Sequence, residues 1–198
     1  MLNNSCEIMG VLNITPDSFY DGKCLSKSSL QKKFINLESS DIIDIGAEST
    51  RPGAKSVPEN EEIRRIEEFL SLNLTHKKLS IDSYKSKVIE YCLINGFNMI
   101  NDISGGGKNF ENIDLSKEYH VPIVIMHMQG NPLSMQKNPN YKNLIDEISL
   151  FFDLRLNYAA KIGLNMDKII LDPGIGFGKS FNNNYEIIKN INEFKKFN

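Results

Sequence analysis

The 198-residue sequence predicts an α/β fold of the TIM (β/α)8-barrel type, with about six of the βα units of such a barrel present. Six short apolar runs recur along the chain, and each precedes a polar turn and a segment of helical period. The runs are nearly continuous in Ile, Val, Leu and Met, which is typical of parallel strands buried on both faces. They span residues 7–14, 41–47, 78–83, 98–104, 122–128 and 168–174.

Polar residues at the ends of these runs decide between an open Rossmann-type sheet and a barrel, the two folds that strict βα alternation allows. An open sheet brings together only the strand ends around its switch point, whereas a barrel gathers all of them at one rim. The polar side chains at or just past the carboxyl ends of the runs are Asn13, Glu48, Asp82, Asn101, His127 and Asp172. Because every run supplies one, the barrel is the favoured fold.

The segments between the runs have the period and the boundaries of amphipathic helices. Pro58 precedes a group of glutamates that suits the dipole of a helix N-terminus, and we place it just inside the second helix. Gly96 and Gly163 are placed as C-terminal caps of the third and fifth helices. The expected apolar stripes are Leu30, Phe34 and Leu37; Ile63, Ile66 and Leu70; and Leu144, Ile148 and Phe151.

Composition and charge limit the class of protein. Because 40% of the residues are hydrophobic and no linker interrupts them, residues 1–198 are expected to form a single domain. The net charge of −2 offers no basic surface, so no nucleic-acid partner is expected. Cys6, Cys24 and Cys92 form no CxxC pair and are expected to be reduced thiols. No signal pattern and no membrane span of about 18 apolar residues is present, which predicts a soluble, cytoplasmic protein.

The stretch LDPGIGFGKSFNNN, residues 171–184, raises the question of a phosphate-binding loop. A P-loop of the form G-x-x-x-x-G-K-[ST] would need glycine at position 173, where the chain has Pro173. A dinucleotide-binding G-x-G-x-x-G that begins at Gly174 would need glycine at position 179, where the chain has Lys179. Both patterns fail by one residue. What remains is Asp172 at the end of a strand, before a glycine-rich turn that lets a flat ligand approach the backbone.

Carboxylate and amide side chains recur at the same rim. Asp82 ends the stretch LSID in the third run, and Asn101 and Asp102 end the stretch MIND in the fourth. Any one of them is more often a helix cap or a structural acceptor. A cluster of buried acids, however, costs free energy unless cations or hydrogen-bond donors surround it. Together with Asp172, the cluster favours a ligand rich in N–H groups, such as a pterin, whose ring amide and exocyclic amine can give one carboxylate two parallel hydrogen bonds.

Six segments of the sequence resemble, in order and spacing, those of the dihydropteroate synthase family. They are MGVLNITPDSFYDGK, IIDIGAESTRPGA, LSIDS, INDISGG, VIMHMQGNP and LDPGIGFGKSFNNNYEII, and the similarity runs from residue 7 to the end. The resemblance implies a transferase of folate biosynthesis that acts on two small molecules. In the reaction it implies, para-aminobenzoate displaces diphosphate from 6-hydroxymethyl-7,8-dihydropterin diphosphate and gives 7,8-dihydropteroate.

The resemblance also implies a catalytic and pterin-binding set. Asp172 would pair with the N3–H and the 2-amino group of the pterin, and Asp82 and Asn101 would bind the rest of its polar edge. Met126 would pack against the face of the ring. Breaking the C–O bond leaves positive charge on the dihydropterin, which carboxylates around the ring would stabilise.

Further matched positions are expected to face the diphosphate and the second substrate. Asn13 would contact Mg²⁺ together with the diphosphate, which fits the preference of this cofactor for oxygen ligands. Thr50 and Arg51, on a long loop, would hold the leaving group or order the loops around para-aminobenzoate. Phe177 would line the slot for that substrate. His127 suits a structural histidine and a ligand contact equally well.

The chain departs from the family after the segment YEIIKNINEF, where members continue into a seventh and an eighth strand. The family segments S-R-K and R-x-H, which contact the pterin and the diphosphate, have no counterpart. The sequence therefore predicts a C-terminally incomplete synthase, with a homodimer partner or a complementing chain as its expected protein partner. A non-catalytic pterin-binding remnant is the first alternative. A pterin-dependent methyltransferase module is the second alternative, and the two long loops at residues 13–23 and 46–58 disfavour it.

Overall fold

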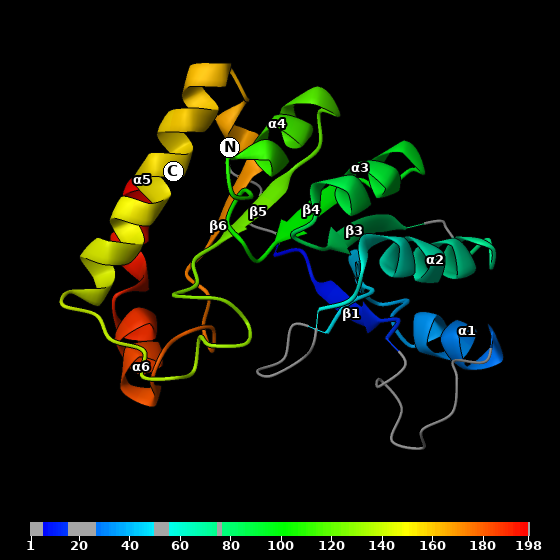
Figure 1. Ribbon diagram of the computed structural model, residues 1–198, viewed down its shortest axis with the longest axis horizontal. Helices are drawn as coiled ribbons and strands as arrows, with labels where there is room; N and C mark the ends of the chain where they lie inside the picture. Colours follow the sequence, from blue (N-terminus) through cyan, green and yellow to red (C-terminus); the bar gives the residue numbers. More distant parts are fainter. Residues whose placement is uncertain (1–5, 16–26, 50–55, 75–76, 198) are drawn as a thin grey trace. The chain divides into compact units, whose positions relative to one another are not determined.

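The computed structural model describes residues 6–15, 27–49, 56–74 and 77–197. Clusters of contacts divide the chain into two compact units. The first comprises Met1–Ser49 and Ser56–Asn101, and the second comprises Thr50–Lys55 and Asp102–Asn198. Figure 1 shows the helices and strands of both units.

Parallel strands form the sheet of the first unit. β1 (Met9–Asn13) pairs with β2 (Ile42–Gly46), β2 pairs with β3 (Lys78–Asp82), and β3 pairs with β4 (Met99–Asp102). The last residue of β4, Asp102, is assigned to the second unit. The helices α1 (Lys27–Ile35), α2 (Glu59–Leu70) and α3 (Ser86–Ile94) follow the first three strands in the chain, as Figure 1 shows. Every residue of β2 is buried, as expected for a central strand of a parallel sheet.

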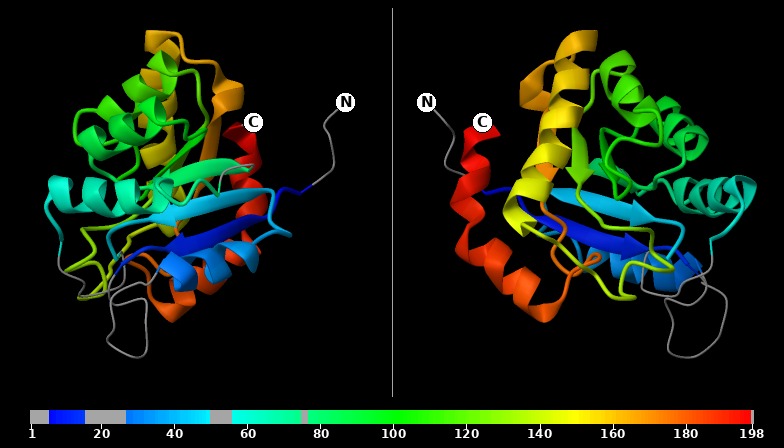
Figure 2. Two further views of the ribbon diagram at one scale, coloured as in Figure 1. Left: turned by 90° about the vertical axis from the view of Figure 1, so that its right-hand side faces the viewer. Right: turned by 60° about the vertical axis from the view of Figure 1, so that its left-hand side comes forward.

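The second unit is built around a pair of parallel strands and a long helix. β5 (Ile123–Met126) pairs with β6 (Ile169–Asp172). The helical elements are α4 (Glu111–Glu118), α5 (Leu144–Ile162), α6 (Phe181–Lys189) and the short η2 (Met166–Lys168) and η3 (Ile191–Phe197). Phe152 of α5 packs with Ile187 of α6 and Phe194 of η3 in one apolar cluster. In Figure 2, α5 (yellow) therefore lies beside α6 and η3 (orange to red).

The predicted strands are confirmed, since each strand lies inside the apolar run that predicts it. The predicted stripe of α2 is wrong by one position. Its buried residues are Glu62, Ile66 and Phe69, whereas Ile63 and Leu70 are half-buried. An ion-pair network that holds Glu62 in the interior, described below, gives the physical reason for the rotation.

Two further helix predictions need small corrections. On α5 the fully buried ring belongs to Phe152, and Phe151 is half-buried. Leu37 lies past the end of α1. The predicted helix boundaries at Pro58 and Gly163 agree more closely with the structure. Pro58 is the N-cap of α2, one position before the predicted one, and Gly163 ends α5 in the left-handed conformation with φ of 76°.

The single domain expected over residues 1–198 stays a prediction, since the contacts divide the chain into two compact units. Within the described residues, none of the helices has the length and the apolar character to cross a membrane.

Candidate active site

A row of side chains crosses the carboxyl end of the sheet in the first unit. In the strand register, Asn13 of β1 is the partner of Gly46, Gly46 is the partner of Asp82, and Asp82 is the partner of Asn101. Register partners on neighbouring strands point their side chains to the same face of a sheet. The two amides and the carboxylate therefore share one face, at the edge where the strands end.

Gly46 gives the row an opening. A Cβ atom at this position would lie 2.7 Å from Asn13 Oδ1 and 3.3 Å from Asp82 Oδ2. Any larger residue would push these side chains away, so the glycine allows the Asn13 amide oxygen and the Asp82 carboxylate to approach the same point from two strands. The result is a small cradle lined by oxygen atoms.

A second acid lies one layer below this row. Asp44 precedes Gly46 by two residues on β2 and is 2% exposed, and Ser80 is its register partner on β3. Its Oδ2 atom accepts a hydrogen bond of 2.8 Å from Asn101 Nδ2. Burial raises the pKa of Asp44, and the neighbouring Ser80 and Asn101 side chains oppose that rise. Asp44 is not among the site residues predicted from the sequence.

A buried lysine joins the two loops that follow β2 and β3. Lys85 Nζ donates to Glu48 Oε2 at 2.5 Å, to the carbonyl of Val57 at 2.6 Å, and to Glu62 Oε1. Glu48 Oε2 also accepts from the backbone N–H of Val57 at 2.7 Å. This network ties both ends of the segment between Glu48 and Val57 to the turn that follows Asp82. Glu48, expected at the rim, is therefore a structural part of the loop base.

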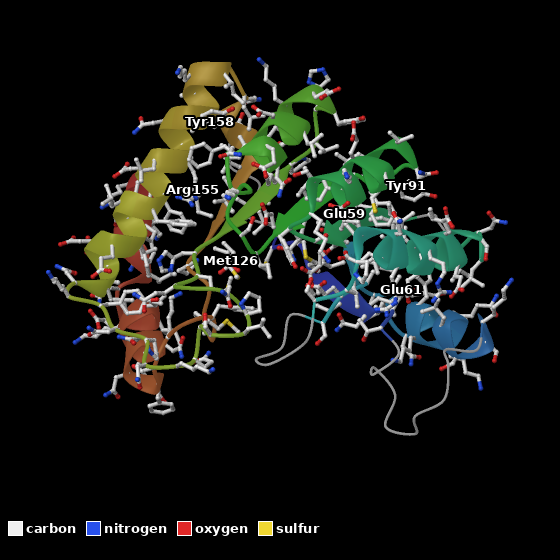
Figure 3. All side chains as sticks on the ribbon, in the orientation of Figure 1. Glu59, Glu61, Tyr91, Met126, Arg155 and Tyr158 are labelled. Atoms are coloured by element: carbon white, nitrogen blue, oxygen red, sulfur yellow. The ribbon has the colours of Figure 1, made fainter. Side chains whose placement is uncertain are left out.

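In the second unit, Asp172 ends β6 beside the end of β5. Its register partner is Met126, the last residue of β5, which is 3% exposed and is labelled in Figure 3. Asp172 Oδ1 accepts from the backbone N–H of Gly174 at 2.7 Å. A Cβ atom on Gly174, whose φ is +69°, would lie 2.0 Å from the carbonyl oxygen of His127. Only glycine allows the turn after Asp172 to pack this closely on the end of β5.

The Gly-Lys-Ser stretch has an internal role. Lys179 is 3% exposed, and its Nζ donates to the carbonyls of His127 and Phe177, each at 3.0 Å. The same Nζ lies 3.0 Å from His127 Nδ1. Burial lowers the pKa of Lys179 to about 8, and the charge of Asp172 opposes that change. Ser180 caps the N-terminus of α6 in a capping box. Both polar side chains of the stretch thus have partners within the chain, Lys179 in the interior and Ser180 at the exposed start of α6.

His127 is a structural histidine in this arrangement. Burial, together with the charges of Lys179 and Arg155, lowers its pKa to about 3, so the ring is neutral at physiological pH. Its ring packs edge-on against Phe151, with 4.9 Å between the ring centroids. A neutral Nδ1 can accept from the lysine ammonium. Of the two roles that the sequence left open for His127, the structure supports the structural one.

Asp102 has a different role from that of its neighbour Asn101. It is fully buried, and its carboxylate accepts from Ser104 N, Ser104 Oγ, Gly106 N and Asn112 Nδ2 at 2.6–2.8 Å. These bonds shape the glycine-rich turn after β4. Arg155 of α5, labelled in Figure 3, donates to the Gly105 carbonyl at 2.7 Å and so supports the same turn. Asp102 therefore organises a loop.

The structure brings the predicted site residues together in two groups. Asn13, Asp82 and Asn101 share the row of the first unit. Asp172 and Met126 are partners in the second unit, and Phe177 lies half-buried on the turn after β6. Thr50 and Arg51 lie outside the described residues. The meeting of Asp172 with Asp82 and Asn101 at one mouth stays a prediction, since they belong to different units.

Comparison with known proteins identifies the family to which such a site belongs. Residues 9–198 match the family described as "Pterin binding enzyme". The dihydropteroate synthase of Haemophilus influenzae is 38% identical over 97% of this chain, and the folic acid synthesis protein fol1 of Pneumocystis carinii is 40% identical over 96% of it. This chain belongs to the pterin-binding enzymes and, among them, to the dihydropteroate synthase family.

Solved structures agree with this assignment. The Yersinia pestis dihydropteroate synthase, solved with a sulfonamide drug complex, matches 96% of this chain with a TM-score of 0.86 and 36% identity. The Xanthomonas albilineans synthase with 4-aminobenzoic acid matches with a TM-score of 0.84 and 33% identity. The predictions of family and of a barrel-type α/β fold are thereby confirmed.

The chain covers only part of the length of its relatives. It spans 74% of the H. influenzae synthase and 71% of the Y. pestis chain. It spans 27% of the P. carinii protein.

Proposed function

We propose that this chain binds 6-hydroxymethyl-7,8-dihydropterin diphosphate and takes part in its condensation with para-aminobenzoate, the dihydropteroate synthase reaction. The observation that carries the proposal is the row of Asn13, Gly46, Asp82 and Asn101 at the end of neighbouring parallel strands. The carboxyl end of the strands is where barrel enzymes hold their substrates. Family membership supplies the chemical class of the ligand.

The row suits the polar edge of a dihydropterin. Asp82 offers a carboxylate, and the Asn101 amide oxygen points away from Asp44 because the amide nitrogen donates to that acid. Two neighbouring acceptors match a ring edge that carries adjacent N–H groups. In the proposal, Asp172 binds the remaining N–H pair and Met126 packs on the ring face. Their pairing at the end of β5 and β6 supports a joint role.

Charge development explains why carboxylates surround the ring. When the bond between the pterin methylene and the diphosphate oxygen breaks, positive charge spreads into the dihydropterin and negative charge stays on the leaving group. A carboxylate that is already in place stabilises the ring cation without rearrangement during the reaction. Asp82 and Asp172 are proposed for this role. The arylamine nitrogen then forms the new bond, and no protein nucleophile is needed.

The residues of the first unit fit a Mg²⁺ ion held together with substrate. Mg²⁺ commonly binds through one or two protein oxygens plus substrate phosphates and water. Asn13 Oδ1 is such an oxygen and lies at the cradle above Gly46. Within the described part of the chain, no group of three or more His, Cys, Asp or Glu side chains could hold a metal ion. In the proposal, Asn13 holds Mg²⁺, which would neutralise charge on the diphosphate.

The second substrate is proposed to lie near the glycine-rich turn after β6. The X. albilineans relative, which was solved with 4-aminobenzoic acid, supports para-aminobenzoate as that substrate. Phe177 on this turn is proposed to line its slot, and Thr50 and Arg51 are proposed to hold the leaving group or to order the loops around para-aminobenzoate. A cytoplasmic location and a homodimer or complementing chain stay predictions from the sequence.

Calorimetry and a coupled assay for diphosphate release test the proposal on the full chain. We expect 6-hydroxymethyl-7,8-dihydropterin diphosphate to bind and para-aminobenzoate to trigger diphosphate release. Asp82→Asn should weaken binding by about 2–4 kcal/mol, because it removes one partner of a charge-assisted hydrogen bond. Asp153→Asn on the exposed face of α5 is the matched control and should bind as the parent chain does. Binding without release would identify a non-catalytic pterin-binding protein, and absence of binding would overturn the proposal.

A further inference from the structure

Asp44 is a buried acid inside a strand that is otherwise apolar. It lies in the middle of β2, every residue of which is buried, with Ile43 and Ile45 fully buried on either side of it. Its Oδ1 atom has no hydrogen-bond partner of good geometry among the described residues, although the Ser80 hydroxyl lies nearby. A buried carboxylate with incomplete partners destabilises a fold, and an apolar residue of similar size would serve stability better. The presence of an acid here therefore calls for another explanation.

The hydrogen bond between Asn101 and Asp44 supplies such an explanation. A side-chain amide can be turned by 180° about its last bond, which exchanges the oxygen and the nitrogen at little steric cost. Asp44 Oδ2 accepts from Asn101 Nδ2 at 2.8 Å. The turned amide would instead bring its oxygen against a carboxylate oxygen, which is repulsive. Asp44 therefore selects one of the two amide orientations.

The strand register shows which atom this selection presents to the site. Asn101 is the register partner of Asp82 in the upper row, whereas Asp44 lies two residues before Gly46, one layer deeper. With Nδ2 directed down to Asp44, the amide oxygen of Asn101 is left for the row. The row then offers acceptors side by side, from Asp82 and from Asn101.

We propose that Asp44 is a positioning residue that sets the donor and acceptor pattern of the pterin site by fixing the orientation of the Asn101 amide. The proposal rests on the proposed function and deepens it, since it assigns ligand discrimination to a residue that does not touch the ligand. Its action passes through Asn101 alone.

Two substitutions separate this role from a structural one. Asp44→Leu removes the acceptor and keeps an apolar side chain of similar size, so Asn101 loses its fixed orientation. We expect about a tenfold loss of affinity for 6-hydroxymethyl-7,8-dihydropterin diphosphate, the scale of one ordinary hydrogen bond. Asp44→Asn carries both an acceptor and a donor, so it can pair with either orientation of the Asn101 amide. It should weaken binding by about threefold, less than Asp44→Leu does, because the hydrogen bond is kept but the orientation is no longer selected.

A double-mutant cycle tests whether the effect passes through Asn101. In the Asn101→Ala background, Asp44→Leu should change affinity by less than about twofold, because the amide that it orients is gone. Urea unfolding of the same variants provides the readout for stability, in which Asp44→Leu should match or exceed the parent chain. An equal loss of affinity in both backgrounds, or no loss in either, would overturn the proposal.

A measurement on the unsubstituted chain does not depend on the folding of any variant. In NMR spectra, the Nδ2 proton of Asn101 that is bonded to Asp44 should exchange slowly with solvent, with no ligand present. Rapid exchange of both Nδ2 protons would show that Asp44 does not hold the amide. Because this result requires no pterin, failure of the positioning role and failure of the proposed function are distinguishable.

Discussion

Replacing Lys85 by Met should destabilise the first unit strongly, because the Lys85 ammonium forms ion pairs with two carboxylates that are almost fully enclosed, those of Glu48 and Glu62. The side chains of Lys85, Glu48 and Glu62 are 11%, 9% and 1% exposed. Breaking a buried ion pair by removing one partner typically costs about 3–5 kcal/mol. Glu48 keeps its bond from Val57 N, and Glu62 keeps its bond from Ser83 Oγ. These remaining donors place the expected loss near the lower end, at about 3 kcal/mol.

The pH dependence of this loss has a definite sign. Burial alone would raise the pKa of Glu48, but the bonds from Lys85 and Val57 outweigh it, so its pKa lies below the ordinary 4.5. Glu48 therefore stabilises the fold above pH 4.5, and the contribution is lost as pH falls through the lowered pKa. Burial raises the pKa of Glu62 despite Lys85. Without the lysine the pKa of Glu62 should rise further. Protonation of Glu62 at low pH should therefore stabilise the variant more than it stabilises the parent chain. Acidification should therefore narrow the difference between the two proteins.

Urea unfolding followed by circular dichroism measures this prediction at pH 7 and at pH 4.5 or below. Lys87→Met is the matched control, because Lys87 lies two residues away, is 75% exposed and pairs with Glu59 at 3.3 Å. A surface pair of this kind contributes about 0–1 kcal/mol, so the control should unfold nearly as the parent chain does. If Lys85→Met lost no more stability than Lys87→Met, the network would not be the structural element described here.

Three further predictions concern the second unit. Gly174→Ala should destabilise the chain by roughly 2–4 kcal/mol in urea unfolding, because its Cβ would meet the His127 carbonyl; Gly176→Ala, also at positive φ but with open space around it, should cost only about 1 kcal/mol. Asp172→Asn should weaken pterin binding in calorimetry by about 2–4 kcal/mol, and unchanged binding would refute the role assigned to Asp172. Lys179 has a pKa lowered from 10.5 to about 8, so the unfolded chain binds more protons between these values and stability should rise with pH in that window. Lys179→Met should lack this rise, and an identical pH profile would contradict the assignment.

The strands and their polar ends could be predicted because they depend on local pattern. A continuous apolar run identifies a strand buried on both faces, and the residue that ends it lies at the rim whatever the rest of the chain does. Asp82, Asn101 and Asp172 were found in this way, and each ends or nearly ends its strand. Family resemblance added the chemical identity of the ligand.

Glu62 shows why the helix faces were harder to predict. A glutamate in the first turn of a helix is normally exposed and interacts with the dipole. Here Lys85, 23 residues away in the chain, holds it in the interior and rotates the buried face of α2 by one position. No periodic pattern contains that information, because it depends on a partner that only the fold brings close.

Asp44 could have been found by a different question. A charged residue inside a run that is predicted to be buried on both faces must have a partner, and Asp44 is the acid within IIDIG. The identity of the partner, Asn101, depends on the order of β2, β3 and β4 in the sheet. In the sequence Lys179 is recognisable only as part of a candidate phosphate loop, whereas its contacts with His127 and Phe177 follow from the turn after β6.

The most direct test of the account is a crystal structure of the full chain with 6-hydroxymethyl-7,8-dihydropterin diphosphate bound. We predict that the polar edge of the ring lies within hydrogen-bond distance of Asp82 and of the Asn101 amide oxygen, above Gly46 at the end of β2. A pterin bound elsewhere on the chain, with neither Asp82 nor Asn101 in contact with it, would contradict the central claim.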